Sequence, residues 1–147
     1  MSRRRSRSVA VAAMAGLLLL AVPGGAVAGN NTVITLDSLA SGETFVATGG
    51  VICPEGTATT DFKKFGGSDN SRAGSFHLTK TLECADGSGT FTIVVNAATV
   101  FGSPGDQGGW AVLDGTDDYA SLRGGGQLVG TYVEDGIIDT YTGSLRK

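Results

Sequence analysis

Residues 75–97 read SFHLTKTLECADGSGTFTIVVNA, and this stretch decides the fold class. Apolar side chains fall on one face of residues 75–84, at Phe76, Leu78, Leu82 and Cys84. Lys80 alone interrupts that row, while His77 faces the other way. The same alternation returns over residues 90–97, at Phe91, Ile93, Val95 and Ala97. A period of two on both sides of an Asp-Gly-Ser-Gly turn predicts a β-hairpin.

Short runs rich in Thr and Val, set between Gly clusters, continue on both sides of this hairpin. They predict strands over residues 32–36, 43–53, 110–113, 127–133 and 137–145, with a bend at Gly49-Gly50. A short helical turn is expected over residues 119–122, capped by Asp117 or Asp118 and ended by Gly124-Gly125-Gly126. Closure into a barrel hides strand edges, so we expect an all-β fold: a small antiparallel β-barrel of about six to eight strands with one disulfide. A β-sandwich is the alternative architecture.

Residues 1–28 are expected to form a secretory signal peptide that is removed. Four Arg residues among the first seven positions precede an apolar run over residues 9–22, and Ala26-Val27-Ala28 offers small residues for cleavage before Gly29. A transmembrane anchor is the alternative, but this run rises only about 21 Å as a helix, short of the ~30 Å hydrocarbon core. The sequence therefore predicts one domain over residues 29–147 that is secreted or extracytoplasmic, at the cell surface or in a periplasm-like space, with no stable membrane anchor.

Cys53 and Cys84 are the two cysteines of the chain, and an even number in an exported protein predicts a disulfide between them. A zinc site would need four ligands, and a nucleophilic Cys would need a His partner, yet His77 is the single imidazole. The disulfide is the preferred interpretation. Closing a loop of about 30 residues contributes roughly 3 to 4 kcal/mol in the chain-entropy model.

Removal of the leader would leave seven basic residues against 14 acidic ones, a net charge of −7. The remaining bases form no stripe that could follow a phosphate backbone, so nucleic acid is not an expected partner. Asp114, Thr116, Asp117 and Asp118 could gather around Ca²⁺, but the EF-hand Gly and distal Glu are missing, and a surface turn is preferred. No Lys-Ser/Thr follows Gly124-Gly125-Gly126 to bind a nucleotide. We expect neither a metal nor a cofactor.

No catalytic motif is recognisable in the chain. A Ser-His-Asp triad would have to use His77, and no Ser stands in a Gly-x-Ser-x-Gly elbow. The carboxylate pairs Asp117-Asp118 and Glu134-Asp135 lie in expected turns, where Asp serves backbone geometry and solvation. These observations favour a protein that is not an enzyme.

Residues 54–74 show no strand pattern and are expected to form a long loop inside the disulfide-closed segment. The loop contains Phe62 and Phe65. It is expected to be either a lid whose aromatic side chains cover a barrel mouth or an Ω-like loop whose two Phe side chains pack against the barrel. His77, Trp110 and Tyr119 complete the set of candidate ligand or lid residues. Core packing is the alternative role for the aromatic members, and a solvent-facing strand position is the alternative for His77.

One stretch suggests a family. Gly109–Gly126, which reads GWAVLDGTDDYASLRGGG, resembles the strand, Gly-Thr-Gly-x-Tyr/Phe, Gly-x-Gly, strand signature of allene oxide cyclase-like and dirigent-like barrels. Asp117 replaces the second glycine of that signature, and residues 139–143 (DTYTG) are similar to the last strand of exported bacterial relatives of that group. The resemblance implies a barrel that holds an apolar small molecule in its mouth. It transfers no catalytic residue, because the pocket residues of that group find no match here.

Two hypotheses about function follow. The first is a noncatalytic binding or extracellular interaction module, with a small apolar ligand held in the barrel. The second is a dirigent- or cyclase-like enzyme that steers the cyclisation or coupling of a small apolar substrate. The interior of the barrel distinguishes them: an open apolar cavity that contains an Asp, Glu, Tyr or Arg favours the enzyme, whereas a filled core leaves only surface interaction.

Overall fold

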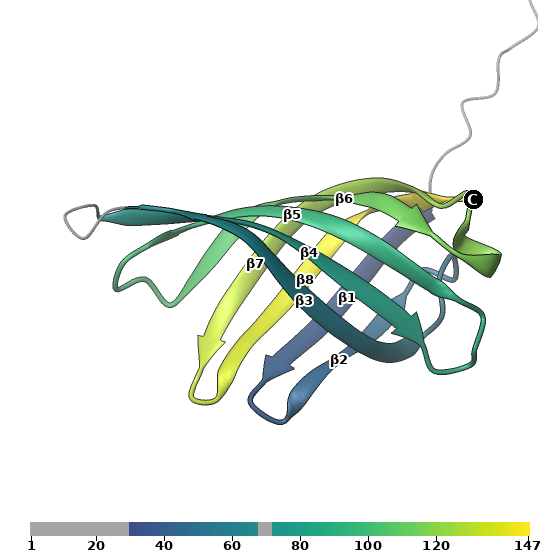
Figure 1. Ribbon diagram of the computed structural model, residues 1–147, viewed down its shortest axis with the longest axis horizontal. Coiled ribbons are helices and arrows are strands. Elements are labelled where there is room, and N and C mark those ends of the chain that lie inside the picture. Colours follow the sequence, from purple (N-terminus) through teal and green to yellow (C-terminus); the bar gives the residue numbers. More distant parts are fainter. Residues whose placement is uncertain (1–29, 68–71) are drawn as a thin grey trace, which may run out of the picture.

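The computed structural model describes residues 30–67 and 72–147, which form a closed barrel of eight antiparallel strands joined in sequence order (Figure 1). The strands are β1 (Asn30–Leu39), β2 (Gly42–Thr48), β3 (Glu55–Gly66), β4 (Ala73–Cys84), β5 (Thr90–Val100), β6 (Gly105–Gly115), β7 (Arg123–Val133) and β8 (Gly136–Arg146). β8 pairs with β1 over ten residues from Asn30 to Leu39, so no sheet edge is left open. The predicted antiparallel barrel is confirmed, and the sandwich alternative is not adopted.

Alternation of side chains builds the core. The predicted inward rows of β4 and β5 are buried or half-buried, and Leu82, Phe91 and Ile93 are completely inaccessible. Their outward neighbours are exposed or half-buried, and His77 is among the exposed ones. β1 shows the same sidedness, because Ile34 and Leu36 are fully buried. Each strand therefore gives one face to the barrel interior, as its period of two requires.

One end of the barrel is closed by a covalent and aromatic plug. The disulfide Cys53–Cys84 ties the β2–β3 connection to the end of β4, with the two Cα atoms 5.9 Å apart. A single turn of 3₁₀ helix, η1 (Asp117–Tyr119), places Tyr119 over the same end, where its ring lies 5.5 Å from that of Phe91. The Tyr119 hydroxyl accepts a hydrogen bond from the backbone N–H of Cys53 at 3.0 Å. The predicted disulfide is confirmed, and side chains fill this end of the barrel.

The expectation of a long loop over residues 54–74 was wrong. Residues 55–66 form β3, which pairs with β4 along most of its length. Its inward positions hold small residues such as Gly56 and Ala58, so no row of large apolar side chains marks the strand in the sequence. The register then shifts between Phe62 and Lys64, and this β-bulge breaks the period of two.

Other boundaries also differ from the sequence-based expectations. β2 ends at Thr48, because Gly49 and Gly50 adopt positive φ angles of 107° and 72° and turn the chain away instead of bending a continuous strand. Gly124-Gly125-Gly126 lies within β7 rather than ending a helix. There the glycines pair with β8 and, at Gly126, with Trp110 of β6. The predicted signal peptide and its cleavage residues lie outside the described residues.

Candidate ligand-binding cavity

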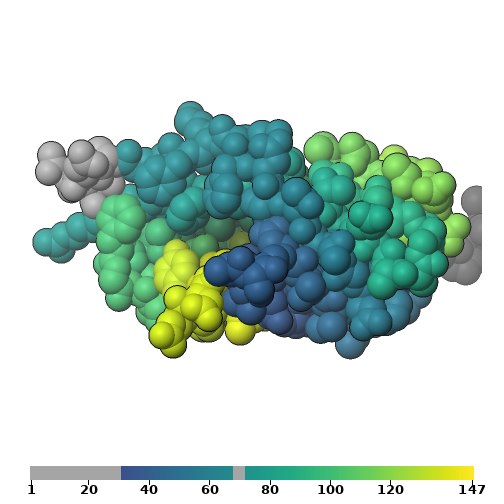
Figure 2. All heavy atoms as spheres, turned by 60° about the horizontal axis from the view of Figure 1, so that its bottom comes forward, coloured from purple at the N-terminus to yellow at the C-terminus, as the bar shows by residue number. Residues whose placement is uncertain are grey.

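The end of the barrel opposite the disulfide contains a cavity of about 240 Å³. Inward-facing side chains from all eight strands line it, among them Leu78, Val95, Ala97 and Leu128. Figure 2 turns this side forward, with the β1–β2 segment in dark blue, the β7–β8 turn in yellow and β3 in teal above them. An engineered apolar cavity of about 150 Å³ is large enough to bind benzene. The cavity can therefore hold a small monocyclic compound.

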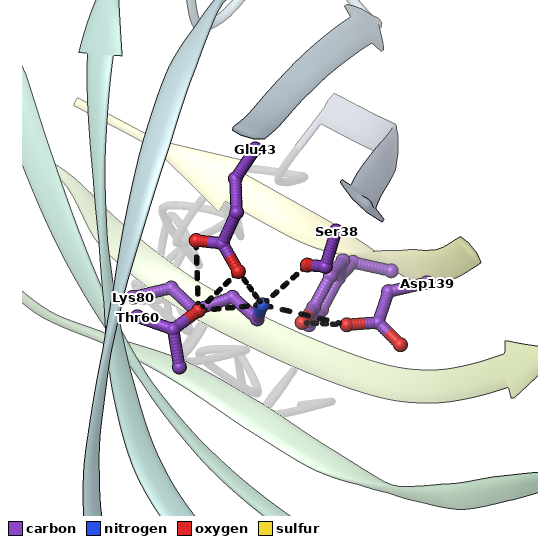
Figure 3. A network of polar contacts seen from close by, with 6 residues as sticks. Ser38, Glu43, Thr60, Lys80 and Asp139 are labelled. Atoms are coloured by element: carbon purple, nitrogen blue, oxygen red, sulfur yellow. Dashed lines mark hydrogen bonds and ion pairs between the residues drawn. The ribbon is translucent and has the colours of Figure 1, made fainter. Parts of the chain in front are cut away.

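A buried lysine crosses the interior at the depth where the apolar core gives way to the cavity. Lys80 of β4 is only 4% exposed, and its ammonium group hydrogen-bonds Ser38 Oγ at 3.0 Å and Thr60 Oγ1 at 2.8 Å (Figure 3). Its Nζ also lies 3.3 Å from Glu43 Oε1 and 3.7 Å from Asp139 Oδ2. These partners hold the Lys80 ammonium group in one place, because a move away from any of them would leave a buried charge without compensation.

Glu43 forms the other half of this ion pair. It lies at the start of β2, and the Thr60 hydroxyl donates to its carboxylate at 2.7 Å. Burial raises the pKa of Glu43, but the hydrogen bond from Thr60 and the positive charge of Lys80 outweigh burial and leave the pKa below its ordinary value. Glu43 is therefore the charged partner of Lys80.

Asp139 and Tyr141 continue the polar layer along β8. The Tyr141 hydroxyl donates to Asp139 Oδ2 at 2.9 Å, and the Tyr141 ring stacks edge-on against Trp110 at 5.9 Å. Burial raises the pKa of the Asp139 carboxyl in spite of the opposing charge of Lys80. Burial and the negative charge of Asp139 also raise the pKa of Tyr141, so Tyr141 stays a neutral donor.

Asp106 of β6 stands apart from this network. Its Oδ1 atom is shielded from solvent, yet within the described part of the chain it has no hydrogen-bond partner. A Cβ built on Gly130 would overlap Asp106 Oδ1 and lie 2.9 Å from Asp139 Oδ1, so the two carboxyl groups converge on the same bare stretch of β7. Burial, and then the charge of Asp139, raise the pKa of Asp106. Among the described residues, Asp106 Oδ1 is thus the solvent-shielded side-chain atom that the protein leaves without a hydrogen-bond partner.

Aromatic side chains form the rim of the cavity on the β3–β4 side. The bulge at Lys63 keeps Phe62 opposite Leu78 and brings Phe65 opposite Phe76, so that Phe62 and Phe65 share a face although they are three residues apart. The rings of Phe65 and Phe76 are 5.2 Å apart, and Phe62 lines the cavity while remaining 67% exposed. An exposed aromatic ring at the mouth of an apolar cavity can contact both a ligand and solvent.

The structure separates the five candidate ligand or lid residues. Phe62 lines the cavity, and Phe65 packs beside it on Phe76. His77 faces outward and is exposed, with Nδ1 at 2.6 Å from Asn96 Oδ1. Trp110 and Tyr119 are buried among core side chains. The Trp110 indole N–H donates to the carbonyls of Gln127 and Thr142, and neither ring lines the cavity.

The polar residues of the cavity were not predicted from the sequence. Glu43, Asp106 and Asp139 each stand in a polar or glycine-containing stretch that gives no motif. Lys80 did leave a signal, since it interrupts the apolar row of β4 at an inward position. A lysine in an inward position must be paired when it is buried, so that interruption indicates a carboxylate on a facing strand.

The described residues form no metal site, and comparisons with known proteins identify no relative. Over residues 30–67 and 72–147, no three His, Cys, Asp or Glu side chains gather where they could hold a metal ion. Within the same ranges, no helix has the length and apolar character needed to cross a membrane. In comparisons with known proteins, no family model, no curated protein and no solved structure matches the chain.

Proposed function

We propose that the protein is exported and binds a small, largely apolar molecule in the open half of its barrel. The observation that carries this proposal is the 240 Å³ cavity, which is walled by apolar side chains and closed below by Tyr141 and the polar layer. Ligand sites in proteins are typically concave, mainly apolar and equipped with a few fixed polar groups. Lys80, Glu43 and Asp139 supply such groups in fixed positions.

Export belongs to the same proposal. The leader-like residues 1–28 and the disulfide support it together, because disulfides persist outside the cytosol. Removal of the four leader arginines would leave an acidic domain, which suits a soluble carrier or a surface module better than a protein that binds anionic membranes.

The experiment that tests binding uses two neighbouring alanines of β5. Ala97 is buried and lines the cavity, whereas Ala98 is exposed on the outside of the barrel. Methyl NMR of the intact protein is recorded during titration with benzyl alcohol. We expect shifts at the methyl groups of Leu78, Val95 and Leu128, loss of these shifts in Ala97→Phe, and retention of them in Ala98→Phe. Shifts confined to outward-facing methyl groups, such as those of Val46, would contradict the proposal.

A dirigent- or cyclase-like enzyme is the second candidate. It is favoured by a specific observation: Asp106 and Asp139, two carboxyl groups with raised pKa, lie inside an apolar cavity. Carboxyl groups inside such a cavity can act as general acid or general base toward a bound substrate. The resemblance of Gly109–Gly126 to such barrels supports the same candidate. A change in the stereochemical ratio of a spontaneous cyclisation, lost in Asp106→Asn, would favour this candidate over simple binding.

A further inference from the structure

The hydrogen-bond donors at the bottom of the cavity are already in use. The ammonium group of Lys80 has three N–H donors, and Ser38 Oγ, Thr60 Oγ1 and Glu43 Oε1 all lie within 3.3 Å of its nitrogen (Figure 3). The Thr60 hydroxyl in turn donates to Glu43. A ligand that needs donors, such as a carboxylate, would have to compete with bonds that the protein has already formed.

The phenolic donor is committed in the same way. Tyr141 donates its proton to Asp139 Oδ2 at 2.9 Å, and Tyr141 is completely buried. On the acceptor side, Asp106 Oδ1 is left without a partner inside the described protein. The unmet hydrogen-bonding capacity of the cavity is therefore an acceptor, and the ligand that completes it must bring a donor.

The charge of the lining points the same way. Among the described residues that line the cavity, the charged ones are the acids Glu43, Asp106 and Asp139 and the single base Lys80. Lys80 lies within ion-pair distance of both Glu43 and Asp139, so one positive charge is shared by two acids, and Asp106 adds a third acid that meets Asp139 beside Gly130. A ligand cation would relieve their repulsion, whereas an anion would add to it. Burial, and after it the charge of Asp139, raise the pKa of Asp106, and a ligand cation would oppose both effects.

We infer that the ligand is a small apolar amine, bound as its ammonium ion. The ammonium donates to Asp106 Oδ1 beside Gly130, and the apolar part lies against Leu78 and Val95. Phe62 and Phe76 border the same space and add aromatic surface for the apolar part. The inference rests on the proposed function, because it specifies which class of molecule occupies the proposed binding cavity.

The test compares three probes of the same size and different charge: benzylamine, benzyl alcohol and benzoate. Dissociation constants are measured at neutral pH by NMR titration of the intact protein. We expect benzylamine to bind about tenfold more tightly than benzyl alcohol, as a charge-assisted hydrogen bond should allow, and benzoate to bind most weakly. Asp106→Asn should lower the affinity for benzylamine to that for benzyl alcohol and leave benzyl alcohol binding nearly unchanged.

Two further variants keep the test sharp. Asp114→Asn removes one negative charge from an exposed position of the same strand, and it should leave the preference for benzylamine intact. Gly130→Ala keeps the Asp106 side chain but displaces its carboxyl group, and it should also reduce benzylamine binding. If benzyl alcohol binds as tightly as benzylamine, or if Asp114→Asn acts like Asp106→Asn, the amine inference is refuted while the binding cavity stands. If no probe shifts the cavity methyl groups, the proposed function itself fails.

Discussion

Replacement of Lys80 by Met should destabilise the protein far more than loss of any other positive charge among the described residues. Lys80 is 4% exposed and is held by Ser38, Thr60 and Glu43. Met fills much of the same space but leaves the Glu43 and Asp139 carboxyl groups without their cation. Removal of one partner from a buried ion pair costs about 3 to 5 kcal/mol. Since small domains are stable by only about 5 to 15 kcal/mol, the variant should lie close to its unfolding threshold.

The assay is equilibrium unfolding in urea at pH 7 with the disulfide intact, followed by the fluorescence of Trp110, which is the single tryptophan and is buried. Lys63→Met is the matched control, because Lys63 pairs with Asp61 on the surface and should lose less than about 1 kcal/mol. Glu43→Gln added to Lys80→Met should recover part of the loss, since it removes one of the stranded charges. A free energy of unfolding for Lys80→Met within about 1 kcal/mol of that of Lys63→Met would refute the buried network.

Three further predictions follow from the same structure. Asp106→Asn should raise the free energy of unfolding at pH 7 by about 1 kcal/mol, because it removes the charge of a half-buried acid whose shielded Oδ1 atom has no partner. That gain should shrink in urea titrations as the pH falls toward 4. The pKa of Asp106 is raised in the folded state, so the destabilisation by its charge grows as the pH rises above the unfolded-state pKa and vanishes below it. Asp139, Glu43 and Lys80 share the cavity, but they are present in both proteins. The double variant Cys53→Ser/Cys84→Ser should lose roughly 3 to 4 kcal/mol in the same assay, since the bridge spans 31 residues, and an unchanged melting temperature would show that the disulfide is dispensable. Phe62→Ala should weaken benzyl alcohol binding several-fold with little change in stability, because the ring is 67% exposed at the mouth, whereas Val46→Ala on the outer surface should change neither.

The fold was predictable from the sequence wherever large apolar residues alternate. Phe76, Leu78 and Leu82 on β4 and the matching row on β5 carry a clear period of two, and the barrel follows once several such strands must hide their edges. β3 was not predicted because most of its inward side chains are small. The bulge at Lys63 also moves the later inward residues from even-numbered to odd-numbered positions.

The candidate site was harder to foresee than the fold. The polar residues of its network, together with Asp106, come from six strands spread along the whole described chain: Ser38 from β1, Glu43 from β2, Thr60 from β3, Lys80 from β4, Asp106 from β6 and Asp139 from β8. Only closure of the barrel brings them together, and no local spacing records it. The aromatic residues were difficult for the opposite reason. Trp110 and Tyr119 are residue types that are common in binding surfaces, but here they pack in the core. An interrupted apolar row, as at Lys80, was the informative pattern.

The occupant of the cavity can be seen in a crystal structure of the protein grown with saturating benzylamine. We expect the aromatic ring between Leu78 and Val95 in the open half of the barrel, with the nitrogen within hydrogen-bond distance of Asp106 Oδ1. This expectation would be contradicted by a barrel whose open half is filled by its own side chains, or by benzylamine bound only on the outer surface.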